Sequence, residues 1–413
     1  MSILVLAPEG PDAELSDVDY ARLMGYGGAK VVRLDPEVAY CHDGIAGLER
    51  RVVELANAHQ VQTMVYALGA EFDFRPTFFH ETLPDVFKVL LLGDDGQYFD
   101  VSHRYYAECF DLVLTVNPPL CDHYALFGTE AWFIPSSFSP TLFSPEANPR
   151  KEIDVSFVGA MLGKEGRDAY ARALAAAGID VRVYGAGTPA GVVSQERVIE
   201  IFRRSRINLN FTRGNLTPLD RHLTINRRVR QVKGRAPKIA LCGSFILSEY
   251  APGIEKLFDI GTEIDVFHDE NELVEKVRFY LAHEEMREKM AAKAYARAIE
   301  QYDEARFWPR LTHAIEARAR EKRSRRAPLP ICIDGMFWSA FGAWRFKYLV
   351  VFLFSGKLRL FLGELLLLLQ TGRFKPYVAL WAAALGLHTS ARTSRLASWV
   401  DHAVGRLRRM FRK

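Results

Sequence analysis

Cysteine is scarce in this chain of 413 residues, and its five copies form no recognisable pattern. They are far apart and no CxxC pair occurs, so the sequence indicates neither a zinc site nor a disulfide framework. We therefore expect reduced, mostly buried thiols in a cytosolic protein. The N-terminus, MSILVLAPEG, has no basic region and too short an apolar run for a signal peptide. It is better explained as a first buried strand.

Two further features are missing. The longest uncharged run in the C-terminal part, Pro376–Ala391, has 16 residues, whereas a membrane-spanning helix needs about 20. No Asp-x-Asp motif lies between apolar strands, which disfavours a metal-dependent transferase built on a single Rossmann-like domain. We expect no metal site and no obligatory cofactor.

The charges are unevenly distributed along the chain. The net charge is only +4, from 54 Lys and Arg against 50 Asp and Glu. Residues 318–413 contain 19 basic and 4 acidic residues, whereas residues 1–317 contain 35 basic and 46 acidic residues. An acidic body with a strongly basic tail indicates an anionic partner for the tail.

Short β-rich runs alternate with helical or turn-rich stretches in the first third of the chain. This alternation predicts a parallel sheet with helices on its faces. A stretch rich in Ser, Pro and Asn at 136–152 predicts a linker. The predicted strands are SILVLAP, KVVRL, VQTMVYAL, VFKVLLLG, DLVLTVN and AWFIP.

A second alternating unit follows the linker, with the predicted strands DVSFVGA, DVRVYGAG, INLNF, SFIL and IDVFH and helices at 270–283 and 284–301. We predict an α/β fold with two Rossmann-like domains facing a cleft, where the carboxyl ends of the strands bind ligands. The predicted parts are an acceptor domain (1–145), a donor domain (152–317) and a basic, aromatic, helical amphipathic tail (318–413).

The tail is the most apolar part of the protein, but Lys and Arg recur through it. Interleaved aromatic, aliphatic and basic side chains suit helices that lie in the interface of a bilayer. The alternatives are a helical subdomain, a dimer interface or a true span. We predict that residues 318–413 bind an anionic membrane surface, which makes the protein peripheral on the inner face of the cell membrane.

Small and basic residues mark two candidate phosphate-binding turns. Gly159 ends a predicted strand shortly before a helix, which leaves room for a phosphate, although a plain turn also explains it. Lys233 and Arg235 precede a predicted helix over 236–242, where two cations oppose the helix dipole unless an anion lies between them. They are candidates for stabilising a departing diphosphate, and an exposed basic turn is the alternative.

Candidate acid–base residues occur in the first domain. Asp94 and Asp95 directly follow the run VFKVLLL, at the carboxyl end of a predicted strand. Carboxylates there can bind an acceptor hydroxyl or act as a general base, but both residues also suit a helix N-cap or turn. His80, in FFHETLP, is a second candidate base.

Residues from about 85 to 305 resemble a known family. The segments DVSFVGAMLGKEGR, SRINLNF and QVKGRAPKIALCGSFILSEYAPGIEKLF are similar to the C-terminal domain of bacterial glycosyltransferases of the spore-maturation, group-1-like type. The resemblance implies a GT-B fold, a nucleotide-sugar bound mainly by the C-terminal domain, and no obligatory metal. The donor-binding residues that it implies are Gly159, Lys233, Arg235, Gly243, Pro252, Gly253 and Glu255.

The chain departs from this family at one position. Relatives have Phe-Glu in the helix, with the acid placed to hold the ribose, whereas this chain has Pro237 and Lys238. Lysine cannot accept hydrogen bonds from ribose hydroxyls. Arg230 stands eight residues earlier, where related enzymes often hold another acid. The donor is unusual, its ribose is held elsewhere, or activity has been lost.

The leading hypothesis is a metal-independent hexosyltransferase that moves a sugar from a nucleotide-sugar donor to a glycan, glycolipid or protein acceptor at the cell envelope. No nucleic-acid partner is expected. One alternative is a non-catalytic, membrane-bound scaffold or nucleotide-sugar sensor, and another is a GT-B-like epimerase or phosphorylase.

Overall fold

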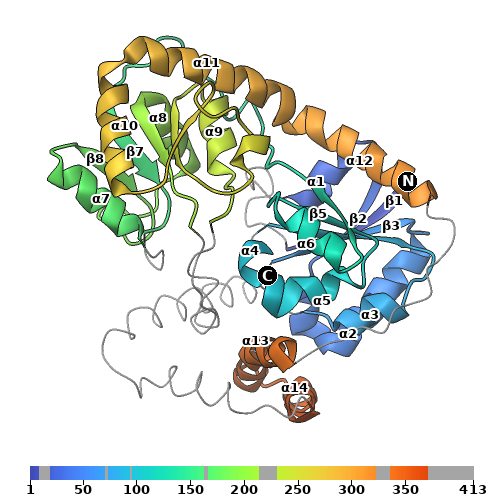
Figure 1. Ribbon diagram of the computed structural model, residues 1–413. Helices are drawn as coiled ribbons and strands as arrows, with labels where there is room; N and C mark the ends of the chain where they lie inside the picture. Colours follow the sequence, from blue (N-terminus) through green and yellow to red (C-terminus); the bar gives the residue numbers. More distant parts are fainter. Residues whose placement is uncertain are drawn as a thin grey trace.

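The chain folds into two α/β units, each built on a parallel β-sheet with helices on both faces (Figure 1). The computed structural model describes residues 1–8, 19–69, 73–93, 95–161, 166–213, 230–321 and 335–370. Both predicted sheets are present, which confirms the α/β fold with two Rossmann-like domains. The predicted division at 145–152 falls between the last strand of the first sheet and the first strand of the second.

The N-terminal sheet pairs in the order β2-β1-β3-β4-β5-β6, with every neighbouring pair parallel. The residues of β3, β4 and β5 are buried throughout, because helices cover both faces of these strands. The strands are β1 (Ser2–Leu6), β2 (Lys30–Leu34), β3 (Thr63–Leu68), β4 (Phe87–Leu92), β5 (Leu112–Thr115) and β6 (Glu130–Phe133).

The C-terminal sheet is also parallel and pairs in the order β11-β10-β9-β7-β8. The chain goes from β7 to β8 on one side and then crosses to β9 on the other, so the winding direction reverses between β7 and β9. Such a reversal is where doubly wound sheets bind ligands. The strands are β7 (Ile153–Val158), β8 (Val181–Tyr184), β9 (Ser205–Asn210), β10 (Ile246–Glu249) and β11 (Asp265–Phe267).

Helices connect the strands, and several begin at capping side chains: the carboxylates of Asp35 and Asp269 accept backbone N–H groups in the first turns of α2 and α10. The helices are α1 (Tyr20–Gly25), α2 (Pro36–Ala58), α3 (Pro76–Glu81), α4 (Asp95–Tyr98), α5 (Arg104–Ala107), α6 (Leu120–Leu126), α7 (Arg167–Ala176), α8 (Gln195–Arg204), α9 (Arg235–Leu241), α10 (Glu270–Ala282), α11 (Glu284–Gln301), α12 (Glu304–Glu321), α13 (Gly335–Phe354) and α14 (Leu358–Gln370).

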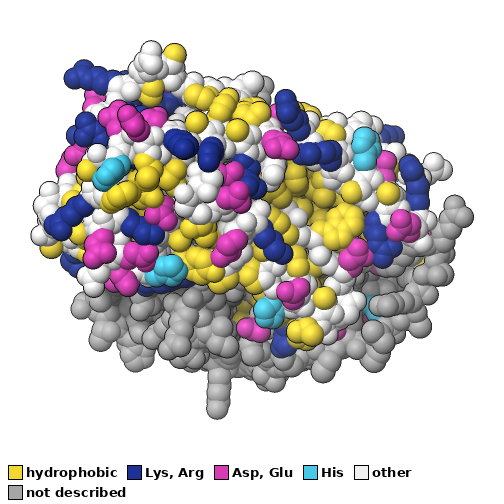
Figure 2. All heavy atoms as spheres, turned by 45° about the horizontal axis from the view of Figure 1, so that its top comes forward, with side chains coloured by type: hydrophobic (Ala, Val, Ile, Leu, Met, Phe, Trp, Pro, Cys, Tyr) yellow, Lys and Arg dark blue, Asp and Glu magenta, His cyan; other side chains and the backbone are white. Residues whose placement is uncertain are grey.

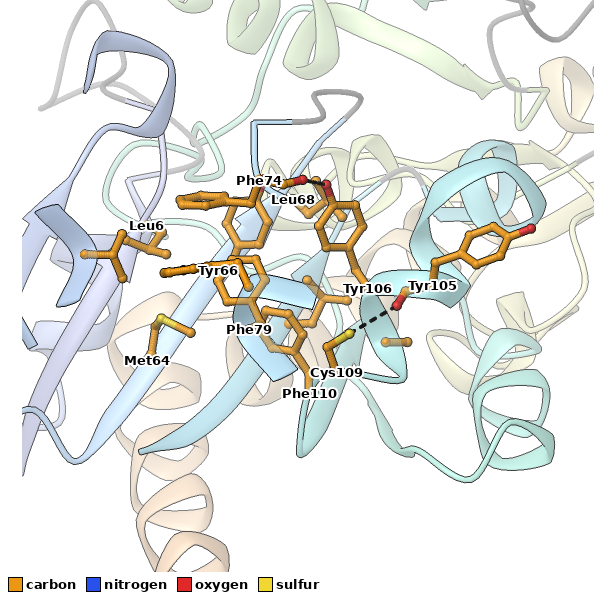
Figure 3. Close-up of a cluster of buried hydrophobic side chains, with 14 of the residues drawn as sticks. Leu6, Met64, Tyr66, Leu68, Phe74, Phe79, Tyr105, Tyr106, Cys109 and Phe110 are labelled. Atoms are coloured by element: carbon orange, nitrogen blue, oxygen red, sulfur yellow. Dashed lines mark hydrogen bonds between the residues drawn. The ribbon is translucent and has the colours of Figure 1, made fainter. Parts of the chain in front are cut away.

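Aromatic side chains fill the core on one face of the N-terminal sheet (Figure 3). The ring centroid of Tyr66 in β3 lies 5.3 Å from that of Phe74 and 5.4 Å from that of Phe79. The buried Tyr106 hydroxyl donates a hydrogen bond to the carbonyl of Phe74. These contacts attach α3 and α5 to β3, so the segments that leave the carboxyl ends of β3 and β4 are held by the core.

The last long helix of the C-terminal half, α12, crosses back to the N-terminal sheet (Figure 1). Trp308, Leu311 and Ile315 on this helix pack with the side chains of β1, β3, β4 and β5. At its start, Arg22 makes a bidentate ion pair with Glu304, with N–O distances of 2.9 and 3.2 Å. Most of α12 lies within the predicted 152–317 segment but packs on the first domain.

The turns that follow the carboxyl ends of the two sheets approach each other where Gly253 faces the ring of Pro118. Gly253, in the turn after β10, has φ +91, and a Cβ there would lie 2.7 Å from Cγ of Pro118, which follows β5. Both residues come directly after strand carboxyl ends. The edges at which doubly wound sheets bind ligands therefore face each other across the two domains.

The described part of the tail forms a helical hairpin, α13 and α14, which packs on the N-terminal domain beside α2 (Figure 1). Helix α2 is interrupted at Gly44 (φ 68, ψ −176), where a Cβ would lie 3.2 Å from Leu360 of α14. The ammonium of Lys357 donates to the carbonyl of Cys41 at 2.7 Å. Part of the predicted tail is thus a packed helical subdomain, one of the alternatives for this region.

A buried ion pair holds the hairpin together. Arg345 of α13 and Glu364 of α14 are 0% and 3% exposed, and their two hydrogen bonds are both 2.9 Å long. The Tyr40 hydroxyl of α2 also donates to Glu364. Burial raises the pKa of Glu364 and lowers that of Arg345, so mutual attraction must keep the pair charged. Among the described residues, no helix is long and apolar enough to cross a membrane.

Candidate functional site

Arg235 lies at the point where the winding of the C-terminal sheet reverses. Its guanidinium donates to the carbonyl of Val158 at the end of β7 at 2.6 Å, and to the side chain of Asn210 at the end of β9 at 2.9 Å. Its Cζ also lies 4.7 Å from the ring centroid of Phe157. One side chain from the start of α9 therefore joins the carboxyl ends of both strands.

Position 159 has no room for a side chain, because the guanidinium of Arg235 lies against its backbone. A Cβ at this position would be 2.5 Å from Nη2 of Arg235 and 2.8 Å from the Phe157 ring. Gly185, in the predicted VYGAG turn after β8, has φ +132, and a Cβ there would lie 2.3 Å from the carbonyl oxygen of Gly159. Close backbone approach at one sheet edge thus explains both glycines.

A second arginine, Arg167, accompanies Arg235 at this edge. It is 2% exposed, occupies the first position of α7, and donates to the carbonyl of Ala160 at 2.6 Å and to that of Arg213 at 3.0 Å. Its Cζ is 5.3 Å from the Phe157 ring centroid, on which Arg235 also stacks. The described hydrogen bonds of both guanidiniums go to neutral acceptors.

The two arginines are poorly compensated cations. Burial, together with the smaller effect of the neighbouring charge of Arg167, lowers the pKa of Arg235 to about 9. Burial also lowers the pKa of Arg167 to about 10, opposed by the charge of Glu249. Because a desolvated cation is stabilised by a nearby anion, an anionic ligand at this edge would relieve the repulsion between them.

Glu249, at the end of β10, forms ion pairs with two further arginines. It is 0% exposed, and Oε1 lies 3.0 Å from Nε of Arg213 and 3.3 Å from Nε of Arg230. Tyr170 donates to it at 2.8 Å and the backbone N–H of Thr212 at 2.9 Å. Burial opposes ionisation of the carboxyl, but these hydrogen bonds and the two arginine charges hold its pKa below the ordinary value.

The cluster as a whole is cationic. It comprises four arginines and one carboxylate at the carboxyl ends of β7, β9 and β10: Arg167, Arg213, Arg230, Arg235 and Glu249. Elsewhere, on the face seen in Figure 2, basic and acidic side chains are interspersed. In the cluster, Arg167 is buried and the other three arginines are half-buried, and this group of positive charge at the winding reversal suits a phosphate-bearing ligand.

The basic turn predicted before α9 lies beside the linker. Lys233 is half-buried and precedes Gly234, where a Cβ would lie 3.0 Å from the Phe138 ring. Lys238, the unexpected cation, lies with Nζ 4.6 Å from the ring centroid of Phe138 and 5.3 Å from that of Phe143. The rings of Phe138 and Phe143 thus attract the ammonium at this position. This attraction explains the presence of a lysine at 238 without any ligand.

The remaining residues predicted for the donor separate into two places. Gly243 (φ +65) ends α9 at the amino end of β10, where a Cβ would lie 3.2 Å from Pro145, so it is not brought to the arginine cluster. Pro252, Gly253 and Glu255 follow the carboxyl end of β10, on the cluster side. There the Glu255 carboxylate accepts the backbone N–H of Gly253 at 3.0 Å.

The candidate acceptor-side residues are also in different environments. Asp95 is 0% exposed and accepts a hydrogen bond from the Thr115 hydroxyl. The same hydroxyl accepts the backbone N–H of Asn117 at 2.9 Å, so Asp95 shapes the segment that carries Pro118. His80 lies in the last turn of α3, which leads to the amino end of β4. Asp94 lies outside the described residues.

Sequence reasoning missed several of these residues. Arg167, Glu249 and Tyr170 became visible only through their contacts, although Arg167 follows the glycine turn after β7 and Glu249 ends a predicted strand. His103 was missed as well. It is buried after the carboxyl end of β4, with Nε2 3.0 Å from the carbonyl oxygen of Gly69.

Other features of the described residues do not add to this site. They contain no group of three or more His, Cys, Asp or Glu placed to hold a metal ion. An open groove of about 490 Å³ lies where the end of β6 meets the end of α11 and the start of α12, and no residue of the arginine cluster lines it. The groove is lined by Trp132, Phe133, Ile134, Pro135, Lys256, Gln301, Tyr302, Phe307, Arg310 and Leu311.

One protein family is similar to the part of the chain that carries the cluster. Residues 167–311 match the family described as "Glycosyl transferase-like". This range contains all four arginines and Glu249, so the cluster lies within the segment that is similar to this family. No curated protein matches the chain.

Solved structures resemble the fold over most of the chain. Sucrose-phosphate synthase from Thermosynechococcus elongatus has a TM-score of 0.55 at 10% identity and covers 78% of this chain and 98% of its own. Alr3699/HepE from Anabaena, in complex with UDP, has a TM-score of 0.55 at 11% identity. The match covers 77% of this chain and 100% of the Alr3699/HepE chain. A glycosyltransferase from Rickettsia africae ESF-5 has a TM-score of 0.54 at 10% identity and covers 78% and 99%. These likenesses confirm the predicted GT-B fold.

Proposed function

Starting from a glycosyltransferase-like domain within a GT-B fold, we propose that this protein transfers a sugar from a nucleotide-sugar donor to an acceptor hydroxyl. The observation that carries the proposal is the cluster of buried and half-buried arginines where the winding of the C-terminal sheet reverses. A nucleotide diphosphate carries negative charge, which would compensate the excess positive charge of this cluster. Arg235 and Arg167 would stabilise it as the leaving group, because charge that develops at a desolvated, preorganised site is strongly stabilised.

A uridine nucleotide is the first donor to test. Alr3699/HepE, whose fold is similar, has been solved with UDP and with UDP-glucose. In this protein the ribose would meet Lys238 instead of a carboxylate, and Lys238 is drawn to Phe138 and Phe143. We infer that the ribose hydroxyls bind other groups of the C-terminal domain.

On the acceptor side, Asp95 would act as a positioning residue. It is buried and holds the Thr115 hydroxyl, which in turn binds the backbone of Asn117. This arrangement fixes the segment that meets Gly253 of the donor domain through Pro118. Asp94 and His80 remain candidates for the base that activates the acceptor hydroxyl.

Five finer assignments belong to the same proposal. The enzyme would be a hexosyltransferase, would need no metal, and would be of the spore-maturation, group-1-like type, as the segment 233–258 indicates. Its acceptor would be a glycan, glycolipid or protein of the cell envelope. The basic tail would hold it on the inner face of an anionic membrane, since each basic residue near such a surface contributes about 1 kcal/mol.

Calorimetry with UDP, GDP, ADP and pyrophosphate, followed by a turnover screen of the matching sugar nucleotides, tests the proposal. Lys233→Gln and Arg235→Gln should each weaken diphosphate binding about tenfold or more, because a hydrogen bond to a charged group contributes about 1.5–3 kcal/mol. Lys293→Gln, an exposed cation on α11, is the matched control and should bind like the wild type.

Arg235 also supports the fold, so its variant needs a check by circular dichroism and thermal melting. The half-buried Lys233 gives an independent answer if Arg235→Gln does not fold. Binding without turnover would replace the transferase with a nucleotide-sugar sensor. If no diphosphate bound to the folded wild type, the assignment would fail and a scaffold would be favoured.

A further inference from the structure

Exposed apolar side chains are concentrated on the α13–α14 hairpin. Five of the thirteen exposed large apolar residues in the described part of the chain lie between positions 353 and 366. Leu353 and the 85%-exposed Phe354 end α13, and Leu358, Leu362 and Leu366 follow on α14. We call these five residues the hairpin patch. Such a contiguous group on a folded protein marks an interaction surface.

The spacing of three patch residues places them on one face of α14. Leu358, Leu362 and Leu366 recur every four residues, so they line one side of α14. The opposite side carries Glu364 and Leu368, each 3% exposed; Glu364 pairs with Arg345 of α13 and accepts a hydrogen bond from Tyr40 of the N-terminal domain. The helix therefore cannot bury the patch by rotating without breaking a buried ion pair.

We propose that the hairpin patch is the surface by which this protein docks onto an anionic lipid bilayer. The inference rests on the membrane association proposed above and assigns it to residues. Arg359 is exposed beside Leu358. The 43 residues that follow the hairpin, 371–413, contain nine Lys and Arg and one Asp. Apolar side chains flanked by cations match the interface of a bilayer that carries negative head groups.

The charges also argue against a second copy of the chain as the occupant. Two copies that shared the patch would bring two strongly basic chain segments together, and like charges disfavour such contact. Because no described helix can cross a membrane, the hairpin would lie in the interface with its apolar side inward.

The position of the hairpin connects this surface to the acceptor side of the protein. Tyr348 of α13 donates to Asp73, just after β3, at 2.8 Å. The ring centroid of Phe337 lies 5.1 Å from that of Tyr105, in the segment after β4. Both contacts are with segments that leave strand carboxyl ends. The hairpin that carries the patch therefore contacts two segments on the side of the N-terminal domain where an acceptor is proposed to bind.

Sedimentation of the full-length protein with vesicles tests the proposal. The vesicles contain phosphatidylcholine alone or phosphatidylcholine mixed with phosphatidylglycerol. The wild type should bind the mixed vesicles, and Leu358→Gln/Leu362→Gln/Leu366→Gln should bind at least about tenfold more weakly, because apolar burial drives interfacial binding. Glutamine preserves helix propensity. Val192→Gln is the matched control, an apolar residue 81% exposed in the C-terminal domain.

Circular dichroism and UDP calorimetry show whether the triple variant keeps its fold and donor site. Equal vesicle binding by wild type and folded triple variant would overturn the patch while leaving other tail residues as the anchor. Absence of wild-type binding would overturn the membrane association as well. A wild-type dimer that the triple variant converts to a monomer would show that the patch is a self-interface. Donor turnover without vesicles tests the transferase separately.

Discussion

Removing Arg345 should weaken the packing of α13 against α14 in the hairpin, at a cost that depends on pH. The side chain is 0% exposed and makes two 2.9 Å hydrogen bonds to Glu364, which is itself 3% exposed. In Arg345→Met the carboxylate stays buried without its cation. Breaking a buried pair in this way costs about 3–5 kcal/mol, so the variant hairpin should open far more often than that of the wild type.

The double variant Arg345→Met/Glu364→Met distinguishes this mechanism from a simple loss of contacts. Two apolar side chains of similar length fill the space without a buried charge, so the double variant should be within about 1 kcal/mol of the wild type or more stable. The destabilisation of Arg345→Met would then be larger than that of the double variant, which is the opposite of additive behaviour.

The pH dependence follows from the carboxyl group. Burial raises the pKa of Glu364, and in Arg345→Met no guanidinium opposes this shift, so the folded hairpin binds the proton more tightly than the open one. A group with a raised pKa in the folded state favours folding at low pH, and this advantage is lost as the pH rises through the folded-state pKa. The defect of the single variant should therefore be smaller at pH 5 than at pH 8.

Hydrogen exchange of peptides from 335–370, followed by mass spectrometry at both pH values, measures the opening free energy of the hairpin directly. Peptides from the C-terminal sheet serve as the internal control. An effect of less than about 1 kcal/mol in Arg345→Met, or a double variant at least as destabilised as Arg345→Met, would refute the reasoning.

Three further predictions concern the sheet edges. Gly159→Ala places a Cβ 2.5 Å from Nη2 of Arg235, so UDP binding measured by calorimetry should weaken about tenfold, whereas Gly363→Ala, with open space around it, should bind normally. Glu249→Gln should cost about 2 kcal/mol in urea unfolding at pH 7. Because the pKa of Glu249 is held down in the folded protein, its contribution exists above the unfolded pKa, and the difference from wild type should shrink as the pH falls below about 4; a constant difference would contradict the assignment. Gly253→Ala, at φ +91 and 2.7 Å from the facing proline, should lower stability by about 1–3 kcal/mol and expand the protein in X-ray scattering; an unchanged scattering profile would mean that this contact does not set the spacing of the domains.

Much of the fold could be predicted because parallel sheets have a simple sequence pattern. Strands such as β4, FKVLLL, are buried on both faces and stand out as continuous apolar runs between turn residues. Every strand predicted from the sequence is present. The structure of the tail was harder to predict, because Lys and Arg within an apolar segment suit a bilayer interface and a packed helix equally. Arg345 turned out to be buried on Glu364, a contact between positions 19 residues apart that no local pattern reveals.

The candidate site divides in the same way. Local sequence marked Gly159 and Arg235, because a glycine after a strand and a cation before a helix are local features. Nothing local indicated that Arg235 joins two strand ends, that Arg167 lies close enough to repel it, or that Glu249 gathers Arg213 and Arg230.

The sequence by itself determined the α/β class, the two sheets, the basic tail and the acids and cations available for chemistry. These follow from composition and from the short-range spacing of apolar and polar residues. Only the tertiary structure decided which charges are buried together, that the two sheets meet edge to edge, and which face of the hairpin is left exposed. Those outcomes depend on contacts between residues far apart in the chain, whose free energy comes from burial and mutual distance.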